Sequence, residues 1–125
     1  MMNRDRPKHL ELHKIKLPLP GFVSILHRIS GLLLFFALPL ILWILQASLR
    51  SIESYTQLVE IFQHPLSKLI ILGVMWSFFH HFCAGIRYLA LDFDIGTSLL
   101  QARASSRWVL VTSLLFTLIA GVWLC

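Results

Sequence analysis

Three long runs of uncharged, mostly apolar residues dominate the sequence, and they cover Ile29–Leu49, Leu69–Ile86 and Trp108–Cys125. A helix needs roughly 20 apolar residues, and at least about 17, to cross the hydrocarbon core of a bilayer. All three runs reach that length. They are continuous rather than alternating, which argues against membrane-spanning strands. The sequence therefore predicts an all-α integral membrane protein with three transmembrane helices.

The composition supports a membrane protein rather than a soluble one. Hydrophobic residues make up 57% of the 125 residues and charged residues only 14%, a balance too apolar for an ordinary soluble domain. The net charge of +5 could suggest nucleic acid, but the basic residues flank the apolar runs and form no basic helix face. We therefore expect membrane lipid and membrane subunits as partners, and no nucleic acid.

Prolines and charges indicate where the helices begin. Pro18 and Pro20 predict an extended segment before a first helix that starts near Phe22. Pro39 lies inside that helix and should kink it, and Pro65 suits the first turn of the second. We expect a single membrane-anchor domain over residues 1–125, with an N-terminal segment at 1–21 and spans at about 22–49, 65–91 and 105–125.

The basic residues predict the orientation of the chain. With three spans, the N-terminal segment and the loop between the second and third spans share one side. That side holds nine of the eleven lysines and arginines, whereas the other loop has only Arg50 and Lys68. Because basic residues concentrate on the cytoplasmic side, we expect a cytoplasmic N-terminus in the inner membrane of a bacterium, rather than a mitochondrial inner membrane.

One group of polar residues lies at the start of the first span: Ser24, His27, Arg28 and Gly31. Their spacing places them on one face of a helix. Polar groups at membrane depth are costly and usually face protein, a cofactor or water. A hydroxyl, an imidazole and a guanidinium on one face can hydrogen-bond a quinone carbonyl or pair with a carboxylate. The alternative is an interfacial arginine that extends to the lipid headgroups.

A second group follows the middle span at intervals of four residues: Gly73, Ser77, His81 and Gly85. Small residues one turn before and after His81 leave space for a porphyrin, if its imidazole ligates haem iron. His80 competes for this role, but Trp76 one turn before it would crowd a macrocycle, so sterics favour His81. The alternative is that both histidines only hydrogen-bond within a helical bundle and the small residues allow close packing.

The chain offers no evident second axial ligand for a haem. His27 is expected nearer the membrane surface than His81, and His9, His13 and His64 lie outside the spans. A second ligand should therefore come from another polypeptide. Arg87, after the middle span, could meet a haem propionate, pair with Asp92 or anchor the helix end. Cys83 and Cys125 match no metal-binding or haem-attachment motif.

Two stretches of this sequence carry a resemblance to a known family. The first runs from Arg6-Pro7-Lys8-His9-Leu10 to Ser24-Ile25-Leu26-His27-Arg28-Ile29-Ser30-Gly31. The second is His81-Phe82-Cys83-Ala84-Gly85-Ile86-Arg87-Tyr88-Leu89-Ala90-Leu91-Asp92. They resemble the Arg-Pro…Ser-Ile-x-His-Arg-x-Ser/Thr-Gly and His-x-x-x-Gly-Ile-Arg-His-Leu-x-x-Asp patterns of the cytochrome b subunit of succinate dehydrogenase, its large membrane anchor. The resemblance covers essentially the whole chain and departs at Tyr88, where the family often has histidine.

The resemblance implies roles for four residues. His81 would be an axial ligand of haem b and so bind the haem iron. His27 and Arg28 would lie near the haem propionates. Ser24 and Arg28 would line the ubiquinone site. The second haem ligand would come from the small anchor subunit, which shares the helical bundle. The iron–sulfur and flavoprotein subunits would dock on the cytoplasmic face.

The expected function is therefore that of the membrane anchor subunit of succinate:quinone oxidoreductase, respiratory complex II. Such a subunit binds haem b at the interface with the small anchor subunit. It forms part of the site where electrons from succinate reduce ubiquinone, in the tricarboxylic acid cycle and aerobic respiration. This chain alone has no catalytic residue, because it lacks a flavin motif and cluster-binding cysteines. The alternatives are a haem-free anchor of the fumarate reductase type and a small non-redox membrane protein.

Overall fold

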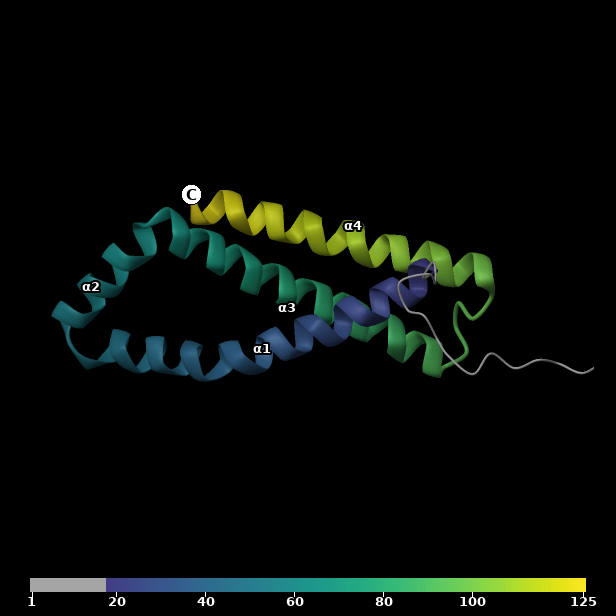
Figure 1. The fold of residues 1–125 in the computed structure, drawn as a ribbon, viewed down its shortest axis with the longest axis horizontal. Coiled ribbons are helices and arrows are strands. Elements are labelled where there is room, and N and C mark those ends of the chain that lie inside the picture. The colour runs from purple at the N-terminus through teal and green to yellow at the C-terminus, as the bar shows by residue number, and fades with distance from the viewer. Residues whose placement is uncertain (1–17) are drawn as a thin grey trace, which may run out of the picture.

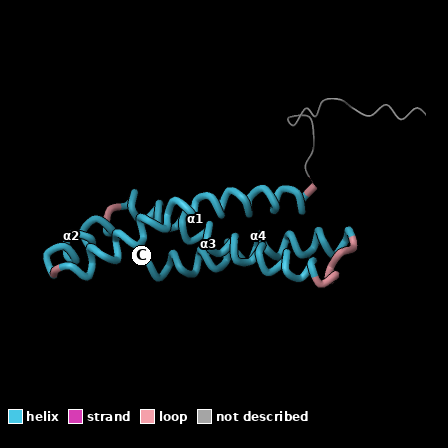
Figure 2. Tube along the Cα trace, turned by 90° about the horizontal axis from the view of Figure 1, so that it is seen from below, coloured by secondary structure: helices cyan, strands magenta, loops and turns pink. Residues whose placement is uncertain are grey.

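A computed structural model of the chain describes residues 18–125. Expectations for earlier residues, among them the basic N-terminal segment and the Arg6–Leu10 motif, lie outside the described residues. Four helices follow in order: α1 (Leu19–Arg50), α2 (Ile52–Gln63), α3 (Pro65–Asp92) and α4 (Leu99–Leu124). Figure 1 shows α3 and α4 side by side and α1 crossing α3, and the turned view of Figure 2 shows α1 on one side of that pair.

Three of these helices, α1, α3 and α4, are long and apolar enough to cross a membrane. The shortest, α4, has 26 residues and is about 39 Å long at 1.5 Å per residue, which exceeds a hydrocarbon core of about 30 Å. The predicted all-α architecture with three long apolar helices is confirmed. The limits of the bilayer spans within these helices stay a prediction.

The first helix begins earlier than its prolines suggested. Pro18 is the N-cap residue, with extended backbone angles, and α1 starts at Leu19 rather than near Phe22. Pro20 is accommodated because the amide groups of the first turn need no intrahelical partner. The helix continues through Pro39 without a break.

The short helix α2 was not predicted. It joins the C-terminal end of α1 to the start of α3 and runs across that end of the bundle (Figure 1). Ser51 caps it by accepting a hydrogen bond from the Ser54 amide at 3.1 Å. Leu58 is buried, whereas Glu53 and Glu60 are exposed. We infer that its two acidic residues made this segment too polar to be recognised from apolar runs alone.

Small residues let the three long helices approach closely. One buried apolar cluster takes a single residue from each of them, Val23, Ala84 and Val109. Buried serines and threonines satisfy their hydroxyl groups within their own helix, as Ser113 does by donating to the Leu110 carbonyl at 3.0 Å. Most large apolar side chains point outward instead, and Phe35 is 69% exposed. Such a surface requires lipid or another membrane subunit.

Candidate functional site

The candidate site lies where the first turns of α1 cross the C-terminal half of α3. His27 of α1 and His81 of α3 stack there with ring centroids 4.1 Å apart and planes 7° from parallel. The sequence analysis expected His27 to lie nearer the membrane surface, away from His81. The helix crossing brings the two rings into contact, and helical periodicity alone cannot predict where two helices cross.

The stacked arrangement limits what the two histidines can do together. Axial ligands of one haem approach the iron from opposite faces of the macrocycle, with their ring edges directed at the metal. Rings that lie face to face cannot do this. The two histidines therefore cannot both ligate one haem iron, and the reason is the geometry of their rings rather than their depth.

The ring of His81 is held by the backbone of α1. Its Nδ1 lies 3.1 Å from the His27 carbonyl oxygen and 3.3 Å from Ser30 Oγ. Ser30 Oγ also donates a hydrogen bond to the same carbonyl at 2.8 Å. A carbonyl oxygen can only accept, so in the tautomer that satisfies this contact Nδ1 carries the proton and the lone pair is on Nε2. No hydrogen-bond partner of Nε2 is found among the described residues.

Gly31 provides the surface on which this ring packs. A Cβ atom at Gly31 would lie 2.9 Å from His81 Cε1 and 3.3 Å from Nδ1, and both distances are shorter than normal van der Waals contact. His81 Nε2 is the most distant of the three ring atoms involved, at 3.9 Å. The ring therefore meets α1 through its Nδ1 edge, and only glycine permits this approach.

The small-residue stripe beside His81 is open at only some of its positions. A Cβ atom at Gly73 or Gly85 would meet nothing within 4 Å. Ser77, by contrast, is fully buried and donates to the Gly73 carbonyl at 2.9 Å. A spacing of four residues drifts by about 40° per step on a helix of 3.6 residues per turn, so the stripe does not stay on one face. Open space next to His81 is thus found on the side of Gly85.

His80 occupies a different environment from its neighbour. It is fully buried, and Trp76 stacks on its ring at a centroid distance of 5.1 Å. Neither ring nitrogen has a hydrogen-bond partner within residues 18–125. An imidazole enclosed by its own chain cannot reach a macrocycle shared with another subunit.

Ser24 and Arg28 lie on the same side of α1 as His27. Ser24 is half-buried and Arg28 is exposed. In the described part of the chain, the Arg28 guanidinium forms no ion pair or hydrogen bond. The chain therefore presents the Ser24 hydroxyl and the unpaired Arg28 guanidinium at its surface. A binding site that uses these two groups needs further residues from outside the described part of the chain to enclose it.

Tyr88, the position at which the resemblance departs, packs against the same cluster. Its ring meets that of His27 edge to face, with centroids 5.1 Å apart. Its hydroxyl group is buried and has no partner among the described residues. A buried phenol normally finds a hydrogen bond, so a group outside residues 18–125 is the expected acceptor or donor.

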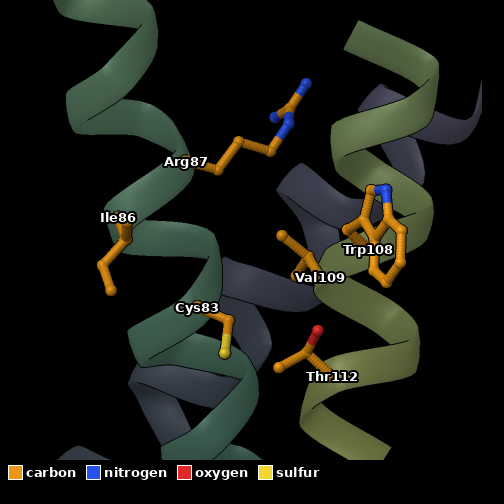
Figure 3. Close-up of a pocket in the computed structure, with 6 residues that line it drawn as sticks. All are labelled: Cys83, Ile86, Arg87, Trp108, Val109 and Thr112. Atoms are coloured by element: carbon orange, nitrogen blue, oxygen red, sulfur yellow. The ribbon is translucent and has the colours of Figure 1, made fainter. Parts of the chain in front are cut away.

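Arg87 extends from α3 toward α4. Its Nε donates to Ser105 Oγ at 2.8 Å and its Nη2 lies 3.4 Å from the Ala102 carbonyl oxygen. The side chain is only 7% exposed and bounds a shallow groove between α3 and α4 (Figure 3). It does not pair with Asp92, but its guanidinium carbon also lies 5.6 Å from the centroid of the Tyr88 ring, close enough for a cation–π contact. These contacts were not predicted from the sequence, in which the third span was expected to begin only at residue 105.

Comparisons with known proteins identify the family of the chain. The model of the family "Succinate dehydrogenase/Fumarate reductase transmembrane subunit" matches residues 2–120. The chain is 36% identical to the succinate dehydrogenase cytochrome b556 subunit of Coxiella burnetii, over 98% of this chain and 99% of that protein. It is 32% identical to the corresponding subunit of Rickettsia felis, over 95% and 91% of the two chains, and 31% identical to that of Paracoccus denitrificans, over 94% and 88%. The chain therefore belongs to the family of succinate dehydrogenase cytochrome b subunits, the transmembrane subunits that the resemblance indicated.

Proposed function

We propose that this subunit anchors succinate dehydrogenase in the membrane, binds haem b together with the small anchor subunit, and forms part of the ubiquinone reduction site. The observation that carries the proposal is the hydrogen bonding of the two ring nitrogens of His81. Its Nδ1 is bonded to the α1 backbone, and no partner of its Nε2 is found among the described residues. A histidine that ligates a metal usually donates its other ring N–H to a carbonyl or carboxylate in this way.

The surroundings of His81 fit a haem shared between two chains. The open space beside Gly85 accommodates a flat macrocycle, and the relatives are cytochromes by name. Haem, when bound, supplies a one-electron redox centre. The second axial ligand is assigned to the small anchor subunit, because His27 stacks on His81 and His80 is enclosed. His27 and Arg28 are assigned to the vicinity of the haem propionates.

Ser24 and Arg28 are assigned to the ubiquinone site. The Ser24 hydroxyl can donate a hydrogen bond to a quinone oxygen, and the Arg28 guanidinium can stabilise the negative charge that develops on that oxygen during reduction. Arg28 is available for this because it is exposed and has no partner in the described region. The electrons come from succinate, oxidised at the flavin of the flavoprotein subunit, through the clusters of the iron–sulfur subunit.

The same proposal includes the orientation of the chain. The candidate site lies at the end of the bundle that carries Arg28, Arg103 and Arg107, so this end is assigned to the cytoplasmic side of a bacterial inner membrane. The N-terminal segment 1–21 would share that side. The flavoprotein and iron–sulfur subunits then dock next to Ser24 and Arg28, where electrons must arrive.

Replacing His81 tests the haem assignment. In the purified complex, His81→Ala should lose the haem absorption spectrum or alter it strongly, because it removes an iron ligand. His80→Leu, which keeps a similar volume in a buried position, should leave the spectrum unchanged. Equal haem content in both variants would contradict the assignment. A wild-type complex without a haem spectrum, oxidised or reduced, would instead favour a haem-free anchor of the fumarate reductase type.

The second alternative, a small non-redox membrane protein, receives no support. The chain belongs to the succinate dehydrogenase subunits. No observation in the structure favours a transport path.

A further inference from the structure

Ser30 is a buried polar residue whose role is not explained by packing. It lies on α1 between His27 and Gly31, both of which contact His81, and its exposed fraction is 0%. Its hydroxyl group is within hydrogen-bonding distance of both the His27 carbonyl and His81 Nδ1. Ser30 therefore contacts α3 at His81, the imidazole that ligates the haem iron in the proposed function.

The three polar atoms form a compact network. The His27 carbonyl lies inside α1, where such an oxygen normally accepts one bond, from the amide four residues later. Here it is also within reach of Ser30 Oγ at 2.8 Å and of His81 Nδ1 at 3.1 Å. In a buried site of low dielectric constant, hydrogen bonds that share an acceptor influence one another strongly. Removing the Ser30 hydroxyl should therefore change the strength of the hydrogen bond between His81 Nδ1 and the His27 carbonyl.

We propose that Ser30 is a positioning residue that sets the electron density of the His81 imidazole, and through it the redox potential of the haem. This inference rests on the proposed function. Ser30 donates to the carbonyl that His81 Nδ1–H also bonds, and so withdraws acceptor strength from that oxygen. Without the hydroxyl, the carbonyl accepts more strongly from Nδ1–H. A more electron-rich imidazole then favours ferric over ferrous haem, because outer hydrogen bonds of a ligand tune its metal.

The direction of the effect distinguishes this role from simple support of the fold. Ser30→Ala should lower the midpoint potential of the haem while the haem stays bound. A modest hydrogen-bond change corresponds to an about threefold lower ratio of ferrous to ferric haem at a fixed applied potential, or about 28 mV at 59 mV per tenfold. The EPR signal of the ferric haem should shift as well, because the ring loses one of its two fixing contacts.

Three further variants make the test specific. Ser30→Cys fills the same space with a weak donor and should behave like Ser30→Ala, without a cavity. Ser30→Thr keeps the hydroxyl group and should keep the wild-type potential. Ser113→Ala is the matched control, because Ser113 is also fully buried and donates to the carbonyl three residues earlier, at 3.0 Å, but has no histidine beside it.

The measurement is a redox titration of the purified complex, with EPR spectra of its oxidised form. The same potential in wild type, Ser30→Ala and Ser30→Cys would overturn the inference, and so would an equal shift in Ser113→Ala. If Ser30→Ala does not assemble, Ser30→Cys and Ser30→Thr decide the question. A wild-type complex that contains no haem would refute the proposed function, whereas an unshifted haem would refute only the role of Ser30.

Discussion

Gly31 offers the most direct test of how α1 holds His81. An added methyl group would lie 2.9 Å from His81 Cε1, whereas carbon atoms in contact normally lie about 3.5–4.0 Å apart. In Gly31→Ala the ring must therefore move by roughly 0.6–1 Å. The contact is with an aromatic ring packed between two helices rather than with the end of a flexible chain, so little of this movement can be absorbed elsewhere.

The movement should break the hydrogen bond between His81 Nδ1 and the His27 carbonyl. That bond is already 3.1 Å long, and a shift of this size takes it beyond about 3.5 Å, where little of its energy remains. Overpacking of this kind costs about 1–3 kcal/mol, and a lost hydrogen bond adds about 0.5–1.5 kcal/mol. At about 1.4 kcal/mol per tenfold, haem affinity should fall by at least about tenfold.

The assay is the ratio of haem to flavin in the purified complex. Gly31→Ala should lower this ratio, although alanine stabilises a helix by up to about 1 kcal/mol relative to glycine. Gly121→Ala is the matched control. Its new Cβ would also lie 2.9 Å from a neighbouring atom, but that atom is the terminal methyl group of Leu72, which can rotate away. A full haem complement in Gly31→Ala, or equal losses in both variants, would refute the reasoning.

Substitutions at two arginines distinguish an effect on quinone reduction from an effect on the stability of the helical bundle. Arg28→Ala should lower the rate of ubiquinone reduction by at least about tenfold while succinate oxidation with artificial acceptors is kept, because it removes a preorganised charge. Arg50→Ala, which changes an exposed arginine at the other end of α1, is the control, and an unchanged quinone rate would remove Arg28 from the site. Arg87→Ala should lower the stability of the complex by about 1.5–3 kcal/mol, the value of hydrogen bonds from a charged donor, here to Ser105 and Ala102 of α4. Thermal unfolding would show this, and a midpoint equal to that of Arg107→Ala, which changes an exposed arginine, would contradict it.

The long helices could be predicted from the sequence because a bilayer imposes a minimum length on any apolar span. The residues at which these helices begin and end could not be predicted in the same way, because they depend on capping residues and neighbouring helices rather than on hydropathy. The start of α4 did have a local signal. Ser98 and Gln101 have the spacing of a capping box, and the Ser98 hydroxyl accepts from the Gln101 amide at 3.3 Å. Reading that motif would have placed Ala102 on α4, within reach of Arg87.

The site was predictable only as far as single helices determine it. Periodicity placed Ser24, His27 and Arg28 on one face of the first helix. It could not reveal that His27 stacks on His81, or that Ser30 and Gly31 contact the same ring. Those contacts depend on where α1 crosses α3, which is a property of the packed pair. The expectation for Ser77 differed from the structure for a related reason, since four-residue spacing drifts around the helix.

The adjacent residues His80 and His81 show why burial within one chain argues against a shared ligand. His80 is the more enclosed of the two, and a search for the most buried histidine would select it. A cofactor held between two subunits must instead meet each chain at its surface. His81 satisfies this condition because α1 holds one edge of its ring and glycine leaves space beside it. In the proposed function, the crossing of α1 over α3 supplies half of the cofactor site, and the small anchor subunit supplies the other half.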